Sequence, residues 1–284
     1  MSADLFDLKA KIVVVTGGGG VLCRSIAADL ASHGVGVALL DLRVEAAQAA
    51  AEEIVRAGGR AIGIECSVLD RASLEGACSK VLSQLGGVDI LVNGAGGNNP
   101  RATTSRETCQ PEDLRKPAEG AHTFFDLEPE GVQFVFNLNF VGTLLPSQVF
   151  GRVMAELGSG VILNISSMNA FRPLTKIPAY SAAKAAVSNF TQWLATHLAP
   201  MHVRVNAIAP GFFLTEQNRF LLTDKRTGQL TPRGTTIIAH TPMGRFGAPE
   251  DLQGTVRWLV SDASAFVTGV VVPVDGGFSA FGGV

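Results

Sequence analysis

Short apolar runs alternate with longer amphipathic stretches along the whole chain, and this alternation constrains the fold more than any other feature. The runs are expected strands because they are short and rich in β-branched residues, and the longer stretches have the length and composition of helices. Strands separated by helices pair in parallel through right-handed crossovers. The pattern predicts an α/β fold with a doubly wound parallel sheet, with strands at 11–16, 35–40, 61–65, 88–92, 160–165, 203–207 and 270–274 and helices at 22–33, 44–57, 71–85, 132–156, 178–199 and 249–261.

No linker interrupts this alternation, so residues 1–284 are expected to form a single domain. Two longer segments, 97–128 and 210–247, each follow an expected strand and break the rhythm. Ligands of open parallel sheets bind beyond the carboxyl ends of the strands, where both segments begin. We expect these extended loops to be substrate walls or a lid, with subunit contact or disorder as the alternative.

Charge and cysteine content exclude several classes of function. The net charge is −2, from 23 basic and 25 acidic residues, and no block of five like charges occurs, so neither nucleic acid nor a membrane surface is an expected partner. Every apolar run stops short of a membrane-spanning length. The first residues lack the pattern of an export signal. The four cysteines lack the spacing of a zinc site or of a disulfide framework: Cys23, Cys66, Cys78 and Cys109. We therefore expect no metal, and we expect reduced thiols in a cytoplasmic protein.

A tyrosine and a lysine four residues apart, Tyr180 and Lys184, give the strongest indication of chemistry. In a helix this spacing places both side chains on one face, and a nearby cation favours the phenolate, which brings tyrosine toward a useful working pH. Ser167 lies thirteen positions upstream of Tyr180 and supplies a hydroxyl for a carbonyl or alcohol oxygen. The three residues indicate proton transfer, although the Tyr-to-Lys spacing alone also arises by chance on solvent-facing helices.

A run of four glycines follows the first expected strand and opens the first expected helix. Bare backbone at such a place lets a diphosphate approach the helix amides, so the run is typical of a dinucleotide site. The alternative is a plain strand-to-helix turn. We expect the cofactor to contact Thr16, Gly17, Gly18, Gly19, Gly20, Val21 and Leu22.

Asp41 ends the second expected strand, about twenty residues after the glycines. A carboxylate at this place accepts hydrogen bonds from ribose hydroxyls and repels a 2′-phosphate, which predicts NAD in preference to NADP. Arg24 and Arg43 are placed to soften that preference by pairing with a phosphate. The alternative role of Asp41 is to cap the next helix.

These motifs occur in one order with Asn93-Gly94-Ala95-Gly96, Asn139 and Pro210-Gly211, and together they resemble the short-chain dehydrogenase/reductase family over residues 8–278. The resemblance implies a Rossmann-type fold, a homotetramer, and hydride transfer between a nicotinamide cofactor and a secondary alcohol. It assigns catalysis to Asn139, Ser167, Tyr180 and Lys184, and it places Tyr180 and Lys184 at the cofactor as well. The other cofactor contacts that it implies are Ser67, Val68, Asn93, Gly94, Ala95, Pro210, Gly211 and Thr215.

The chain departs from the family pattern at several of these positions. Val21 and Cys23 stand where the family has glycines, Gly94 replaces an asparagine, and Ser67 replaces a common aspartate. Asn139 also has an alternative role, which is to satisfy helix backbone groups. In the assignment by resemblance, Asn139 instead supports a water relay to the catalytic lysine.

Polar residues crowd the expected substrate edge, which indicates a hydroxyl-rich ligand more than a steroid or fatty acyl chain. The strings around 94–100, 134–140 and 210–219 resemble the D-mannonate oxidoreductase, or fructuronate reductase, branch of the family. This resemblance implies conversion of D-mannonate and NAD to D-fructuronate and NADH. Because the two long loops lie at the expected substrate edge, we expect Arg101 or Arg219 to hold the substrate carboxylate. The expected substrate contacts are Asn98, Arg101, Asn169, Gln217 and Arg219.

Two alternatives to this function stay open. Another sugar acid or polyol, such as gluconate, fits the same polar residues. A dinucleotide-sensing regulator without turnover is the alternative from a different class, although the chain retains Ser167, Tyr180 and Lys184 and lacks a basic face for DNA. The apolar segment Val270–Val284 suits a contact between subunits.

Overall fold

The computed structural model describes residues 4–115, 120–214, 219, 221–224 and 226–283. Within these residues, seven parallel strands form one sheet in the order β3-β2-β1-β4-β5-β6-β7, the doubly wound α/β arrangement of Rossmann type that the alternation predicts. The strands are β1 (Ile12–Thr16), β2 (Gly36–Asp41), β3 (Arg60–Glu65), β4 (Ile90–Asn93), β5 (Gly160–Ile165), β6 (Val203–Pro210) and β7 (Val271–Val274).

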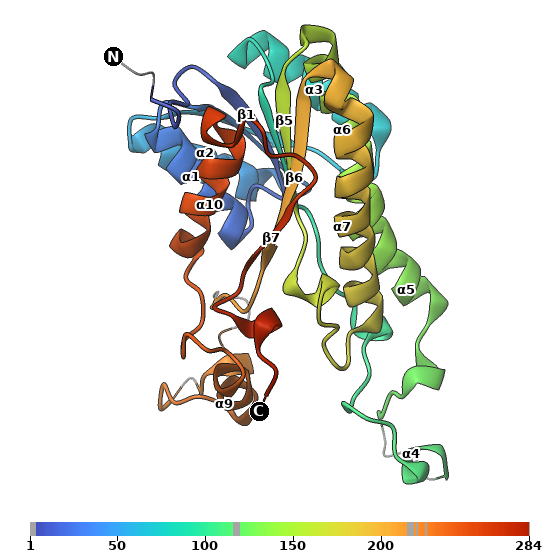
Figure 1. Ribbon diagram of the computed structural model, residues 1–284. Coiled ribbons are helices and arrows are strands. Elements are labelled where there is room, and N and C mark those ends of the chain that lie inside the picture. Colours follow the sequence, from blue (N-terminus) through green and yellow to red (C-terminus); the bar gives the residue numbers. More distant parts are fainter. Residues whose placement is uncertain (1–3, 116–119, 215–218, 220, 225, 284) are drawn as a thin grey trace.

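Helices cover both faces of the sheet (Figure 1). One face packs against α1 (Val21–Ser32), α2 (Val44–Arg56) and α10 (Gln253–Val260). The other packs against α3 (Arg71–Leu85), α6 (Gly142–Leu157) and α7 (Pro178–Leu198). This double cover explains why the strands read as continuous apolar runs in the sequence.

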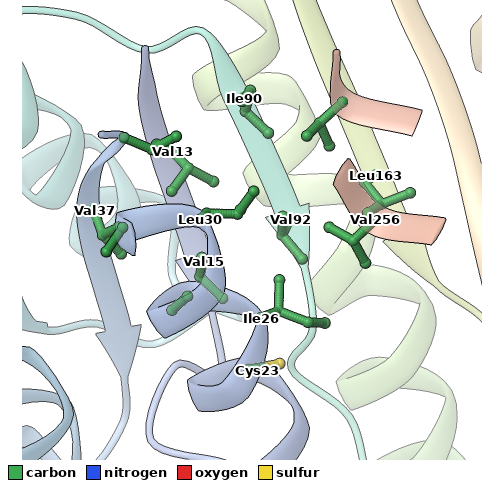
Figure 2. Packing of buried hydrophobic residues seen from close by; sticks show 14 of the residues in the cluster. Val13, Val15, Cys23, Ile26, Leu30, Val37, Ile90, Val92, Leu163 and Val256 are labelled. Atoms are coloured by element: carbon green, nitrogen blue, oxygen red, sulfur yellow. The ribbon is translucent and has the colours of Figure 1, made fainter. Parts of the chain in front are cut away.

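Strand β1 shows how the two cores are filled. Val13 and Val15 belong to the core under α1, whereas Ile12 and Val14 belong to the opposite core. Figure 2 shows Val13 and Val15 close to Leu30 of α1 in the first core. Because successive side chains of a strand point to opposite faces, one run of five apolar or small residues supplies both layers.

The chain from 129 to 157 differs from the prediction of one helix over 132–156. A π-helical turn at Asn137–Val141 separates α5 (Pro129–Phe136) from α6. Hydrophobic periodicity does not distinguish a π turn from an α turn, so the sequence gives no sign of it. Such turns occur frequently at functional sites, and this one carries Asn139.

Both long segments that interrupt the alternation lie at one end of the sheet. Segment 97–128 contains the short helix α4 (Pro111–Arg115), and segment 210–247 contains α9 (Pro232–Ala239). Figure 1 shows both short helices at the lower end of the molecule, α9 on the left and α4 on the right. They follow β6 and β4 in the chain. Among the helices that the structure describes, none is long and apolar enough to cross a lipid bilayer.

Candidate active site

Ser167, Tyr180 and Lys184 come together at the carboxyl edge of the sheet. Ser167 follows β5, and the other two lie in the first turns of α7. The Ser167 hydroxyl hydrogen-bonds with the Tyr180 phenol, and Lys184 Nζ lies 5.6 Å from the centroid of the Tyr180 ring. Ser167 and Lys184 are buried and Tyr180 is partly exposed. The structure therefore brings together the three groups that the spacing singles out.

Burial controls the protonation of this cluster. It raises the pKa of the Tyr180 phenol, and the hydrogen bond with Ser167 opposes this effect. It also lowers the pKa of Lys184 from 10.5 to about 8, against an opposing influence from the Cys23 thiol. The sequence predicts a lysine that lowers the tyrosine pKa, and here the balance is the reverse. The Lys184 ammonium donates to the Ile165 carbonyl at 2.8 Å and faces the ring, so burial dominates at the phenol.

Polar contacts fasten α7 to β5 beside this cluster. The Ser166 hydroxyl donates to the Lys184 carbonyl at 3.1 Å and lies 2.7 Å from the Ser188 hydroxyl. One layer deeper, Asn164 Nδ2 donates to Thr191 Oγ1 at 2.9 Å. These buried hydrogen bonds fix the rotation of α7, and they hold Tyr180 and Lys184 toward the sheet edge because both side chains leave the same helix.

Asn139 ties the π-helical turn to the loop after β4. Its Nδ2 donates to the Gly97 carbonyl at 2.7 Å and to the Val135 carbonyl at 2.8 Å. A Cβ at Gly96 would lie 2.7 Å from Asn139 Oδ1 and 3.2 Å from Lys184 Nζ. Asn139 thus performs the backbone-satisfying role that was its alternative, and it also stands beside the lysine with only Gly96 between them. Gly96 belongs to the motif Asn93–Gly96 but is not among the expected site residues, and the lack of space for a side chain between Asn139 and Lys184 explains why it is glycine.

The glycine run packs closely on the turn after β4. Gly17 has φ +64°, and a Cβ there would lie 2.9 Å from the Ala95 Cα, so only glycine fits this contact without strain. Gly20 is the N-cap of α1 and has no side chain to occupy the helix amides. The amides of Gly18, Gly19 and Gly20 already bond to the protein, so a diphosphate would bind at the first backbone N–H groups of α1, which the glycines leave uncovered.

Asp41 joins the glycine run to the end of β2. Its Oδ2 accepts from the Gly19 amide at 3.1 Å, and its Oδ1 accepts from the Arg43 amide at 3.0 Å. Arg43 is the N-cap of α2, so Asp41 bonds an amide before the helix and not one inside it. The carboxylate therefore stands beside the expected dinucleotide path, while Arg24 is ion-paired with Glu53.

Two departures from the family pattern, Cys23 and Gly94, touch each other. A Cβ at Gly94 would lie 2.1 Å from Cys23 Sγ and 2.9 Å from the Thr16 carbonyl oxygen. The thiol thus fills the volume next to the turn that an ordinary side chain at position 94 would need. Cys23 is buried, which raises its pKa to about 12. The two substitutions form one packing unit under the expected cofactor path, where Figure 2 shows Cys23 at the end of α1.

Several other expected cofactor residues are buried and hold the turn after β4 in place. Thr16 is fully buried, and its hydroxyl accepts from the Gly94 and Ala95 amides at 3.1 and 3.3 Å. Asn93 is buried and donates to Asn164 Oδ1 at 2.9 Å. These contacts position the turn. Gly18, Val68 and Pro210 are also buried, Val21, Leu22, Ser67 and Gly211 are partly exposed, and Thr215 lies outside the described residues.

The expected substrate residues are dispersed around the same edge. Asn169 is buried, and its Oδ1 has no hydrogen-bond partner among the described residues, so this acceptor points to a ligand. Asn98 is exposed and donates to Thr103 Oγ1 at 3.0 Å. Arg101 is ion-paired with Glu128, and Glu130 lies 3.7 Å away. Arg219 is exposed, and Gln217 lies outside the described residues.

Three cations near this edge were not singled out from the sequence: Arg172, Lys176 and Arg233. Arg172 and Lys176 lie between Ser167 and Tyr180 in the chain, and that position is the signal by which they could have been found. Lys176 has φ +73°, an unusual backbone conformation for a residue with a side chain. Among the described residues, no group of three or more His, Cys, Asp or Glu is arranged to hold a metal ion.

Comparisons with known proteins match this geometry. The family model described as short chain dehydrogenase matches residues 11–226. The chain is 52% identical over 279 residues, covering 98% of both chains, to the uncharacterized oxidoreductase UxuB of Bacillus subtilis. A Haemophilus influenzae structure with bound NAD, whose proposed activity is that of a D-mannonate oxidoreductase, is 50% identical with a TM-score of 0.92 over 98% of each chain. The 7alpha-hydroxysteroid dehydrogenase of Escherichia coli is 30% identical over 276 residues, or 97% of both chains.

The contact between Cys23 and Gly94 predicts coupled substitutions. Gly94→Ala places a methyl group against the Cys23 sulfur, so it should lower the free energy of unfolding by about 1–3 kcal/mol and weaken NAD binding. In a Cys23→Ala background the same change should cost at least ~1 kcal/mol less, with a residual cost from the Thr16 carbonyl. Urea unfolding and NAD titration of the four proteins measure the cycle. Strictly additive effects would show that the two residues do not share this volume.

The buried ammonium predicts a conflict between stability and activity. Lys184→Met removes the cost of burying a cation, so it should raise the free energy of unfolding at pH 7 by on the order of 1–3 kcal/mol. The same change should abolish turnover, because the catalytic ammonium is lost. The pKa of Lys184 is lower folded (about 8) than unfolded (10.5), so the unfolded state binds more protons between these values. Between pH 8 and 10.5 the free energy of unfolding of the wild type should therefore rise relative to that of the variant. Urea unfolding at pH 7 and 10 tests this, and equal pH slopes for the two proteins would contradict it.

Proposed function

The chain belongs to the short-chain dehydrogenase/reductase family, and from that premise we propose that it interconverts D-mannonate and D-fructuronate with NAD(H). The main observation behind the proposal is that Ser167, Tyr180 and Lys184 lie together at the edge of the sheet that also carries a glycine-rich helix N-terminus. This arrangement can move a proton at an alcohol oxygen next to a bound dinucleotide. The nicotinamide supplies the acceptor of the hydride.

Each catalytic residue has a role that follows from its surroundings. The Tyr180 oxygen takes the hydroxyl proton during oxidation and returns it during reduction. Tyr180 is partly exposed, and it packs against a small apolar cluster formed by Ala102, Val135, Ala179 and Ala183. Ser167 hydrogen-bonds the Tyr180 oxygen and orients the substrate carbonyl. Lys184 stabilises the phenolate once the proton has moved, and Asn139 holds the loop at Gly97 against which the cofactor ribose would rest.

We propose NAD in preference to NADP because Asp41 stands beside the glycine run. A carboxylate at this place accepts hydrogen bonds from ribose hydroxyls and repels a 2′-phosphate. Of the two arginines placed to counter that repulsion, Arg24 is ion-paired with Glu53, whereas Arg43 is exposed two residues from Asp41. The NAD present in the Haemophilus influenzae relative supports the same choice.

The substrate proposal rests on polar groups near the catalytic cluster. Asn169 lies two residues after Ser167 and holds a buried, unpartnered amide oxygen that can accept a hydrogen bond from a substrate hydroxyl. The activity proposed for the 50% identical relative supports a sugar acid. A 30% identical relative acts on a steroid, so membership of the family does not by itself choose the substrate. Gluconate or a polyol is the runner-up within the class.

A substrate panel tests this function directly. D-mannonate, D-gluconate, D-mannitol and a 7α-hydroxysteroid are assayed with NAD and with NADP by absorbance of the reduced nicotinamide. We expect the highest kcat/KM for D-mannonate with NAD, because hydroxyl contacts and the carboxylate both contribute to binding. Tyr180→Phe, the matched control, should lose about 100- to 10,000-fold in kcat and keep its NAD affinity within a few fold.

Three results would contradict the proposal. A steroid or a neutral polyol as the best substrate would exclude the sugar acid. A higher kcat/KM with NADP would exclude the role given to Asp41. Undiminished turnover in Tyr180→Phe would exclude the proposed proton transfer, and NAD binding without turnover of any alcohol would favour the dinucleotide-sensing alternative.

A further inference from the structure

A cavity of about 600 Å³ lies between three segments that are far apart in the sequence. Segment 172–176 forms one wall, and α9 and Phe212 form the opposite wall. Glu107 is contributed by segment 97–128. Both long loops that interrupt the alternation of strands and helices therefore reach this cavity, whose size suits a small organic ligand.

Cations dominate the rim of this cavity. Its charged side chains are Arg172, Lys176 and Arg233, against the single carboxylate of Glu107. Wherever the structure is described, no carboxylate lies within ion-pair distance of the three cations, although other arginines are paired in this way. We call this region, lined by Glu107, Arg172, Lys176, Phe212, Arg233 and His240, the cationic cleft.

The Arg172 side chain and the Lys176 backbone are held in place by hydrogen bonds that do not neutralise either charge. Arg172 Nε donates to the Ser279 carbonyl at 3.1 Å, which anchors the guanidinium and leaves its charge unpaired. The Lys176 carbonyl accepts from the Thr104 amide at 2.8 Å, and this contact holds the unusual φ of +73°. Backbone kept in such a conformation is typical of a functional position, because the surrounding structure must maintain it.

The cleft borders the site of proton transfer along the chain. Lys176 lies four residues before Tyr180, and Arg172 lies five residues after Ser167. Phe212 follows the Pro210-Gly211 turn at the end of β6. A sugar acid whose hydroxyl carbon lies at Tyr180 carries its carboxylate several bonds away, so the proposal requires the cleft to lie within that reach of the phenol.

The arginines expected from the sequence are less suited to this task. Arg101 is neutralised by Glu128 and Glu130, both from the chain around α5, and it does not line the cleft. Arg219 is exposed and is likewise not part of the cleft wall. An unpaired guanidinium binds a carboxylate without first having to lose a partner.

We propose that the cationic cleft binds the carboxylate of an acidic substrate, with Arg172 and Lys176 as the principal ligands and Arg233 of α9 closing the opposite side. The inference rests on the proposed function for the identity of the acid. It assigns the specificity for acids over neutral polyols to residues 172–176, between the catalytic serine and tyrosine. The partial positive charge at the N-terminus of α9 adds to the same field.

The test compares D-mannonate with D-mannitol, which has a neutral group in place of the carboxylate. Arg172→Ala and Lys176→Ala should each raise KM for D-mannonate about 10- to 100-fold, with kcat changed much less, because a charge-assisted contact is lost. Both variants should leave the kinetics with D-mannitol within about 2-fold. Arg172→Lys keeps the charge without the planar fork, so it should recover part of the loss. Arg56→Ala, at an exposed arginine in the last turn of α2, is the matched control and should leave the kinetics with both substrates as in the wild type.

A second measurement separates binding from turnover. In a Tyr180→Phe background loaded with NAD, calorimetric titration of D-mannonate should show the same 10- to 100-fold loss of affinity on adding Arg172→Ala or Lys176→Ala. Full turnover and binding of D-mannonate in these variants would overturn the cleft proposal and leave the proposed function standing. Turnover of neutral alcohols alone, with no binding of D-mannonate to the wild type, would overturn both.

Discussion

The hydrogen bond from the buried Lys184 ammonium to the Ile165 carbonyl is the contact on which the site depends. It joins α7 to the end of β5, and so it fixes Tyr180 against Ser167. The cost is the desolvation of a cation, which lowers the pKa of Lys184 to about 8. Ser166 and Asn164, at the end of β5, also hydrogen-bond to α7. These bonds help to keep the helix in place and so offset the cost of burying the ammonium.

Two departures from the family pattern depend on each other in the turn beneath the expected dinucleotide site. Cys23 and Gly94 stand where the family pattern has a glycine and an asparagine, and the Cys23 sulfur lies where a Cβ at position 94 would be. Each change alone looks like damage to a binding motif. Together they preserve the volume under the turn, and the Thr16 hydroxyl still holds the Gly94 and Ala95 amides in place.

The sequence predicts the parallel sheet and the catalytic cluster for local reasons. The strands are apolar on both faces because helices cover both, and the Tyr180 to Lys184 spacing is a property of one helix. The π-helical turn around Asn139 could not be predicted, because its five residues are too few for hydrophobic periodicity to distinguish it from the α-helices on either side.

Contacts between distant segments are what the sequence leaves undetermined. Glu128 lies 27 residues from Arg101, so their ion pair gives no local pattern. The cationic cleft needs three segments to meet, and so its arginines look like ordinary surface residues in the sequence. The sign of the pKa change at Tyr180 likewise depends on burial, which residue spacing does not reveal. Thr215 and Gln217, two expected contacts, lie outside the described residues.

Transfer of an isotope label tests the central claim that this cluster removes a proton from an alcohol whose hydride passes to a nicotinamide. D-mannonate carrying deuterium on the carbon that becomes the ketone is oxidised by the wild-type protein with NAD, and the reduced cofactor is isolated and analysed by mass spectrometry and NMR. The account predicts that one deuterium appears at C4 of the nicotinamide and that turnover slows relative to unlabelled substrate. Ketone formation with the label released to solvent, and none at C4, would contradict it.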